Sequence, residues 1–328
     1  MDKLKNQKTI RWGIIGCGAV TEVKSGPAYQ QTEDFELVAV MRRDAEKAKD
    51  YARRHGVPKY YTKAADLIND PEVDAVYIAT PPDTHKYYAL KVAQAGKPCC
   101  VEKPMAPSYS DSLAIYNAFE EKSLPLFVAY YRRSLPRFIK IKEWISHGEI
   151  GDIRHIRWHL SKPANQLDLS KKYNWRTDGK IAPGGYFDDL ASHGLDLFTW
   201  LLGDIEKAYG ISVNQQELYS AKDAVTACWL HKNGITGEGS WNFGAAERQD
   251  KVEILGSKGK ILFSVFQEDA QEMQNAQGTT RVFVENPKHI QKYHVKNIRD
   301  HLIEGKTHPS HGSSALHSSW VMDEILGL

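Results

Sequence analysis

The sequence has few cysteines and no long uninterrupted apolar run. Its cysteines show neither C-x-x-C spacing nor the density of a disulfide scaffold; they are Cys17, Cys99, Cys100 and Cys228. No stretch approaches the ~18 apolar residues that a membrane-spanning helix needs. The apolar run at 10–20 is interrupted by Arg11 and by glycines, which is unlike a signal peptide. We therefore expect a cytoplasmic protein without a membrane partner.

The sequence also lacks an excess of charge of either sign. Its 43 Lys and Arg residues against 41 Asp and Glu leave a formal charge of +2, which gives no basic field for binding nucleic acid. A hydrophobic content of 41% and a charged content of 26% are ordinary for a folded protein. At roughly 100–200 residues per domain, the 328 residues predict two domains.

In the first part of the chain, short apolar runs alternate with amphipathic stretches. This alternation is typical of repeated βα units around a parallel sheet. The predicted strands are 10–15, 37–41, 59–61, 75–79, 98–101 and 126–129, and the predicted helices are 44–55, 83–95 and 108–122. Asp44, Asp83 and Ser108 are candidate N-caps, and Gly56 and Gly96 are candidate helix ends. We predict an α/β, doubly wound domain here.

After residue 131 the pattern changes to closely spaced strands. One helix, 135–147, is followed by predicted strands at 153–160, 208–213, 225–230, 236–241, 251–255 and 260–265, which indicates a largely antiparallel sheet. A polar loop at 162–183 and a helical run at 185–202 lie between the first two strands, and a loop of that length is usually functional or disordered. An amphipathic run at 314–326 ends the sequence.

A Gly-x-Gly turn, Gly16 to Gly18, follows the first predicted strand. Glycines in that position let the main chain approach a pyrophosphate. We therefore predict that Gly16, Gly18, Ala19 and Val20 bind a dinucleotide. The third position of the fingerprint holds Thr21, where glycine or alanine is usual. The alternative, a plain tight turn, is disfavoured by the strand and helix alternation that follows.

The second strand runs into Arg42 and Arg43, where NAD-binding folds carry an acidic residue for the ribose hydroxyls. An arginine matches a 2′-phosphate in geometry and charge, whereas a carboxylate repels it. We predict a preference for NADP(H) over NAD(H), with Arg42 on the phosphate and Arg43 on the adenine or assisting. The alternative is a solvated pair of charges at a strand end.

Two loops follow later strands, at the edge of the sheet where ligands bind in open α/β folds. The first is Thr80-Pro81-Pro82, which its prolines stiffen and which leads to His85 at a helix start. The second is Glu102-Lys103-Pro104, directly after the strand at 98–101. We predict that both loops and His85 contribute to the cofactor site and that Lys103 faces the cofactor. The alternative for Lys103 is a side chain that extends into solvent, and Pro104 is a candidate for a cis peptide bond.

Asp189 and His193 lie four residues apart after Gly184-Gly185. On a helix this spacing places both side chains on one face. Histidine gives or takes a proton near neutral pH, and a neighbouring carboxylate orients and tunes it. Taken alone, a pair with this spacing is more often formed by surface or capping residues, since such pairs are common on helices. No Cys or Glu cluster supplies further ligands, so we predict no metal.

Together, Gly16-x-Gly18, Glu102-Lys103-Pro104 and Gly184-Gly185 followed by Asp189-x-x-x-His193 resemble the glucose-fructose oxidoreductase/inositol dehydrogenase (Gfo/Idh/MocA) family. The resemblance covers nearly the whole chain. It implies an α/β Rossmann domain at 1–131, joined at 132–328 to an α+β domain with a large, open, mostly antiparallel sheet. It also implies hydride transfer between a nicotinamide and a sugar, cyclitol or related hydroxy/oxo compound. The departures are Thr21 and Ala191, where the family commonly has glycine.

By position, Lys103, Asp189 and His193 match the family's lysine, aspartate and histidine, which we expect to be catalytic. His193 would be the acid in reduction and the base in oxidation, and Lys103 would hydrogen-bond the reacting oxygen or tune His193. Asp189 would hold substrate hydroxyls or the imidazole. Whether Lys103 or His193 donates the proton stays open. The family's open sheet often mediates oligomers, so we expect a homodimer or homotetramer formed through it.

Four further residues are candidates for binding the substrate, because they could stack on and hydrogen-bond a polyol: Tyr131, Arg133, Trp175 and Arg176. Ordinary packing at a domain junction is the alternative. The histidines near the end of the sequence show no regular ligand spacing, and we expect them at the surface: His289, His294, His301, His308, His311 and His317.

Three other functions stay open. A dihydrodiol dehydrogenase is a close variant of the leading hypothesis. A ligand-sensing regulator on the same fold has no need of Lys103 and His193 together, and both are present. A glycosidase that uses tightly held NAD is disfavoured by Arg42 and Arg43.

Overall fold

The computed structural model describes residues 9–328 and divides into two compact units. The first contains the chain up to Ser134 together with Pro287–Leu316, and the second contains Leu135–Asn286 together with His317–Leu328. The sequence-based division has its boundary close to Ser134 but assigns Pro287–Leu316 to the second domain. That segment belongs with the first unit because its apolar side chains enter that unit's core: Val295, Ile298 and Leu302.

The first unit is built on a six-stranded parallel sheet in the order β3-β2-β1-β4-β5-β6. Its strands are β1 (Ile10–Ile15), β2 (Phe35–Met41), β3 (Lys59–Tyr61), β4 (Ala75–Ile78), β5 (Cys99–Val101) and β6 (Leu126–Val128). The strand order reverses between β1 and β4, which is where doubly wound sheets bind ligands. The predicted fold of this part is confirmed.

Helices cover both faces of this sheet, because parallel strands present apolar side chains on both sides. One core includes side chains of α3 (Gly26–Gln31), α4 (Ala45–His55) and α11 (Lys292–Glu304), and the other those of α5 (Ala64–Asn69), α6 (His85–Gln94) and α7 (Tyr109–Glu120). A short helix, α2 (Ala19–Val23), follows the glycine turn, and α12 (Gly312–Leu326) begins in the first unit and ends in the second. The sequence analysis did not predict α3, α5 or α11.

Most of the predicted helix boundaries are confirmed. The carboxylate of Asp44 accepts a hydrogen bond from the main-chain N–H of Lys47 (3.1 Å), and the hydroxyl of Ser108 accepts one from Asp111 (3.2 Å). Gly56 ends α4 with a φ of +64°, a conformation that glycine adopts readily. The prediction for Asp83 was wrong. It lies in a 3₁₀ turn, Pro82–Thr84, because the prolines before it set a tighter turn ahead of α6.

The second unit contains an eight-stranded sheet in the order β14-β13-β12-β11-β7-β10-β9-β8. Its strands are β7 (Ile153–Ser161), β8 (Ile205–Val213), β9 (Ala224–His231), β10 (Thr236–Asn242), β11 (Gln249–Gly256), β12 (Gly259–Phe263), β13 (Gln271–Asn275) and β14 (Gly278–Val282). All neighbours are antiparallel except β7 and β10. The mostly antiparallel sheet is as predicted, but the polar strands β13 and β14 carry too weak an apolar signal to be predicted.

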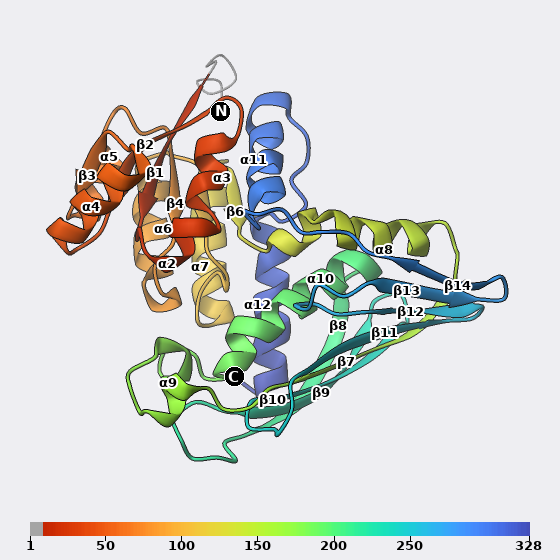
Figure 1. Ribbon diagram of the computed structural model, residues 1–328. Helices are drawn as coiled ribbons and strands as arrows, with labels where there is room; N and C mark the ends of the chain where they lie inside the picture. The colour runs from red at the N-terminus through yellow and green to blue at the C-terminus, as the bar shows by residue number, and fades with distance from the viewer. Residues whose placement is uncertain (1–8) are drawn as a thin grey trace. The chain divides into compact units, whose positions relative to one another are not determined.

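One face of this sheet is covered by helices α8 (Pro136–Ser146) and α10 (Ser192–Leu202) and by the end of α12 (Figure 1). The approach of α10 is close, because a Cβ on Gly194 would lie 2.3 Å from the ring of Trp158. At Gly210 of β8 a Cβ would lie 2.4 Å from the carbonyl oxygen of Ile325 in α12. The opposite face carries alternating exposed residues, as expected for an antiparallel sheet with one covered side.

The predicted helical run at 185–202 is two elements. A π-helical turn, Phe187–Ala191, leads directly into α10. π-turns are rare and occur frequently at functional sites. The long loop before it contains a short helix, α9 (Gln166–Leu169), and a 3₁₀ turn, Trp175–Thr177.

The prediction that the late histidines lie at the surface was wrong for His294 and His308, which are 0% and 1% exposed. The other four, His289, His301, His311 and His317, are partly exposed. His308 follows α11 in the first unit, and its ring meets Phe127 of β6 edge-on. No helix within residues 9–328 is long and apolar enough to cross a membrane.

Candidate functional site

The glycine turn between β1 and α2 lies against the loop that follows β4. Gly16 has a φ of +93°, and a Cβ there would come within 2.7 Å of the Thr80 side chain and 3.0 Å of the Ala79 main chain. Gly18 has open space instead, because its Cβ would meet only one atom, at 3.8 Å. The turn therefore fits against the Thr80 loop on one side and leaves main chain accessible at Gly18 on the other, as a pyrophosphate requires.

Arg42 stands beside this turn at the end of β2. Its guanidinium donates a hydrogen bond to the carbonyl oxygen of Cys17 (3.2 Å), and its main-chain N–H donates to Tyr61 (3.1 Å). Arg42 is half-buried, whereas Arg43 is exposed. The contact with Cys17 brings one cation of the pair next to the candidate dinucleotide turn.

His85 is completely buried and joins the two predicted loops. Its Nε2 lies 2.8 Å from the carbonyl oxygen of Thr80, and its Nδ1 lies 3.1 Å from that of Pro104. Burial lowers the pKa of His85, and these carbonyl contacts act in the opposite direction. Both ring nitrogens face main chain, so His85 holds the loops together and does not point at a ligand. Its predicted place in the cofactor site is therefore that of a positioning residue.

Glu102 is the centre of a buried junction at the end of β5. Its Oε1 accepts hydrogen bonds from the hydroxyl of Tyr77 (2.6 Å) and from Nε2 of Gln291 (2.7 Å), and its Oε2 accepts one from the main-chain N–H of Lys103 (3.1 Å). Glu102 is 7% exposed, Gln291 is 1% exposed, and Lys103 is half-buried. The bond from Lys103 to Pro104 is cis. This junction fixes the main chain at Lys103.

Sequence reasoning missed Gln291, which lies 189 residues from Glu102. Nothing in its local sequence marks it, because the residue precedes an unpredicted helix. The same segment contacts the end of α2, where His289 Nδ1 lies 2.6 Å from the carbonyl oxygen of Val23. Residues 289–291 thus touch both the segment after the glycine turn and the Glu102 junction.

Two of the predicted substrate residues are buried in the first unit. Arg133 is 5% exposed and donates a hydrogen bond to the carbonyl oxygen of Pro309 (3.0 Å). Tyr131 is 9% exposed, and its ring is 5.1 Å from the guanidinium of Arg132. Both lie in a 3₁₀ turn, Tyr131–Ser134, after β6.

In the second unit, the π-turn and the first turn of α10 carry Asp189 and His193. Asp189 accepts a hydrogen bond from Nε of Arg176 at 2.7 Å, and Arg176 stacks its guanidinium over Trp175 at 4.3 Å. His193 is 4% exposed and meets the ring of Phe266 edge-on at 5.9 Å. The structure therefore joins three predicted residues directly: Trp175, Arg176 and Asp189.

Lys162 is a second residue that sequence reasoning missed. It follows β7, and its ammonium lies 3.5 Å from the centre of the Tyr186 ring. The Tyr186 hydroxyl donates to the carboxylate of Asp168 (2.8 Å) and accepts from the amide of Asn174 (3.0 Å). The only sequence signal was a lysine at the start of the long polar loop. Burial lowers the pKa of Lys162, and Asp168 and Asp189 partly oppose that shift.

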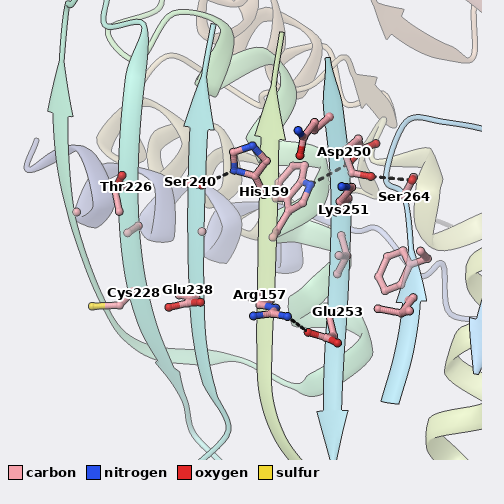
Figure 2. Close-up of a pocket in the computed structure, with 18 of the residues that line it drawn as sticks. Arg157, His159, Thr226, Cys228, Glu238, Ser240, Asp250, Lys251, Glu253 and Ser264 are labelled. Atoms are coloured by element: carbon pink, nitrogen blue, oxygen red, sulfur yellow. Dashed lines mark hydrogen bonds and ion pairs between the residues drawn. The ribbon is translucent and has the colours of Figure 1, made fainter. Parts of the chain in front are cut away.

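A separate hollow of about 1070 Å³ lies on the uncovered face of the eight-stranded sheet. Figure 2 shows Arg157 paired with Glu253 and His159 hydrogen-bonded to Ser240 (2.7 Å) on this face. Glu253 is also paired with Lys260 at 3.1 Å. None of the predicted site residues lines the hollow, so it is a different surface from the candidate catalytic site. Across residues 9–328, no three His, Cys, Asp or Glu side chains gather in a way that could hold a metal.

Comparisons with known proteins agree with the two-part fold. A family model described as "Oxidoreductase family, NAD-binding Rossmann fold" matches residues 10–130, and one described as "GFO/IDH/MocA C-terminal domain" matches 138–262. Oxidoreductase P35 of Formosa agariphila is 37% identical over 98% of this chain and 99% of its own. Myo-inositol 2-dehydrogenase of Thermotoga maritima is 26% identical over 82% of this chain and 79% of its own. Levoglucosan dehydrogenase in complex with NADH shares the fold, with a TM-score of 0.86 and 23% identity over 97% of this chain and 96% of its own.

Proposed function

We propose, because the chain belongs to the GFO/IDH/MocA family of oxidoreductases, that it transfers hydride between NADP(H) and a sugar, cyclitol or related hydroxy/oxo compound. The observation that carries this proposal is the buried Glu102 junction, which fixes the main chain of Lys103 at the carboxyl edge of a doubly wound sheet. Curated relatives named as sugar and polyol dehydrogenases support the substrate class.

The residues divide the chemistry between them. A bound nicotinamide would supply or accept the hydride, and in reduction a negative charge would develop on the substrate oxygen. The ammonium of Lys103 would stabilise that charge, and the imidazole of His193 would donate the proton in reduction and remove it in oxidation. Asp189, fixed by Arg176, would orient the substrate hydroxyls or the imidazole. We keep Trp175 and Arg176, with Tyr131 and Arg133, as candidates for substrate contacts.

The main chain of the glycine turn and Arg42 support a phosphorylated dinucleotide. Gly18 has the open space that a pyrophosphate needs, and Arg42 stands beside the turn through its bond to Cys17. A cation at the end of β2 suits a 2′-phosphate. We therefore propose NADP(H) as the preferred cofactor. The family model that matches residues 10–130 is described more generally as an NAD-binding Rossmann fold.

Two further proposals concern the whole protein. The uncovered sheet face is the proposed contact of a homodimer or homotetramer, because it joins exposed apolar side chains on β8 to paired charges on β7 and β11. A cytoplasmic location is supported by the cysteines, which are all free thiols, with three of the four buried.

The test is an assay of hydride transfer with purified protein. The absorbance of the reduced nicotinamide would be measured over a panel of polyols and keto-sugars, with each of the two cofactors. Lys103→Met and His193→Asn should each lower turnover at least about 100-fold, while cofactor binding is retained. Exposed residues of the same type, Lys63 and His147, provide control variants Lys63→Met and His147→Asn. Near-normal turnover in Lys103→Met or His193→Asn would remove that residue from the mechanism. Bound NAD that is never released would favour the NAD-dependent glycosidase.

A further inference from the structure

Lys162 is fixed in position by the eight-stranded sheet. It is the first residue after β7, and its main-chain N–H donates to the carbonyl oxygen of Asn242 (3.0 Å), the last residue of β10. Because β7 and β10 are parallel and in register, they end together at Ser161 and Asn242. The lysine therefore leaves the sheet at a fixed point.

The ammonium of Lys162 rests on an aromatic platform. Its Nζ lies 3.5 Å from the centre of the Tyr186 ring and 5.6 Å from that of Phe243. Tyr186 is 5% exposed, and its hydroxyl is fixed by Asp168 and Asn174. The cation–π contact offsets part of the cost of removing an ammonium from water. The two rings carry no negative charge, however, so they do not neutralise the ammonium.

Carboxylates near Lys162 are engaged elsewhere. Asp168 is 5% exposed, and both of its oxygens accept from the hydroxyl of Tyr186. Asp189 is paired with Arg176. In the part of the chain that the structure describes, no carboxylate oxygen lies within 4.0 Å of the Lys162 ammonium.

The surroundings add positive charge to this position. Arg176 and Arg248 lie close enough to Lys162 to disfavour its protonated form, while Asp168 and Asp189 favour it. The cations around this position, with Lys162 itself, therefore number three, against two carboxylates that already accept hydrogen bonds from other residues. A neutral polyol would leave the half-buried ammonium without a counter-charge, whereas a bound anionic group would complete it.

We infer that Lys162 is a specificity-determining residue that binds a carboxylate of the substrate, and that the substrate is therefore an acidic sugar of the hexuronate class. This inference rests on the proposed function, which places the reaction at His193 and Asp189. It specifies in addition that the substrate carries a negative charge. Tyr186 and Asp168 position Lys162 and do not themselves recognise the carboxylate.

Equilibrium binding tests the inference without turnover. Isothermal titration of the protein saturated with NADPH would compare hexuronates with their neutral hexoses: D-glucuronate with D-glucose, D-galacturonate with D-galactose, and D-mannuronate with D-mannose. Each pair differs only by a carboxylate in place of a hydroxymethyl group. In at least one pair, the acid should bind about 10-fold or more tightly than the neutral sugar, and added salt should reduce that preference.

Two variants decide whether Lys162 is responsible. Lys162→Met keeps the length and apolar stem of the side chain but removes the charge, and should abolish the preference for the acid while leaving the affinity for the neutral sugar within about twofold. Lys172→Met, at an exposed lysine of the same loop, should keep the preference. Equal binding of acid and neutral sugar in every pair, or a preference that survives Lys162→Met, would overturn the inference. A Lys162-dependent preference without hydride transfer would refute only the proposed reaction.

Discussion

Gln291 is the residue whose contribution is least visible from the sequence. Its side-chain amide donates to Glu102, whose other oxygen holds the main chain of Lys103. Gln291→Met, of similar size, leaves Glu102 with one fewer donor and loosens this junction. We expect kcat to fall about 10-fold or more, because misplacement of a catalytic group reduces the rate. The pH profile of kcat should also shift, because a displaced Lys103 would no longer tune His193 in the same way.

The measurement is a pH profile of kcat alongside the dissociation constant for NADPH. The cofactor affinity should change little in Gln291→Met, because the amide does not contact the glycine turn. Gln94→Met, at an exposed position of α6, is the matched control and should behave as wild type. An unchanged pH profile together with an unchanged kcat would show that the junction does not position Lys103.

Arg42 gives a prediction on cofactor choice. Arg42→Asp replaces the cation at the end of β2 by a carboxylate, which repels a 2′-phosphate and can accept from ribose hydroxyls. The ratio of kcat/KM for NADPH over NADH should fall at least about 100-fold, measured with one substrate at saturation. Arg53→Asp, at an exposed arginine of α4, should leave the ratio unchanged. An unaltered preference in Arg42→Asp would refute the role of Arg42.

At the scale of elements, the π-turn places a carboxyl group in the interior next to Asp189. One oxygen of Asp188 accepts from the main-chain N–H of Gly184 (2.9 Å), and the other has no hydrogen-bond partner in the described structure. Burial raises the pKa of Asp188 to about 7, and the carboxylates of Asp323 and Asp189 add to the shift. The folded protein therefore binds a proton here that the unfolded chain releases near pH 4.

This difference makes stability depend on pH. Between the ordinary pKa near 4 and the folded value near 7, the folded state holds more protons, so the contribution of Asp188 to stability falls as pH rises through that window. Asp188→Asn, which cannot ionise, should be more stable than wild type at pH 8 by on the order of 4 kcal/mol, with the difference vanishing towards pH 4. Thermal unfolding across pH 4–8 measures it. Asp152→Asn, with a side chain 80% exposed, should show no such trend, and a flat difference for Asp188→Asn would contradict the prediction.

Elements that were predictable from the sequence are those whose signal is local. Most strands of the parallel sheet are short, mainly apolar runs that alternate with amphipathic stretches, so the local pattern located them. Strands β13 and β14 have polar sequences and exist because they pair with β12, which no local pattern shows. Helix α11 is amphipathic, and its apolar side chains enter the core of the first unit. Its histidines weakened the apolar pattern in the sequence, so the helix was not predicted.

The same reasoning separates the parts of the site. Gly16, Lys103 and His193 were predicted as site residues because each belongs to a motif with fixed spacing. Lys162 and Gln291 were missed because their partners, Tyr186 and Glu102, lie 24 and 189 residues away and only the fold brings them together. Burial is equally non-local, which is why the surface assignment of His294 and His308 was wrong.

At the scale of the whole molecule, the uncovered sheet face gives the last prediction. Tyr209 and Ile211 are 64% and 74% exposed on β8, and residues two apart on a strand share a face. On the same face, with β9 and β10 between them and β8, Arg157 of β7 and Glu253 of β11 form a charge pair (Figure 2). A second copy of this surface would remove both apolar side chains from water and offer charges of both signs to the other copy, as a two-fold interface requires.

Light scattering after size-exclusion chromatography should give a mass of two or four chains for the wild type. The double variant Tyr209→Glu/Ile211→Glu should give the mass of one chain, because four glutamates in each two-fold contact would be desolvated without partners. Its circular dichroism should stay that of the wild type, since both side chains are exposed in the single chain. Tyr87→Glu, at an exposed tyrosine of α6, should keep the wild-type mass. A monomeric wild type would exclude the contact. A double variant with unchanged mass would place the contact elsewhere, because Tyr209 and Ile211 are the most exposed large apolar side chains of β8.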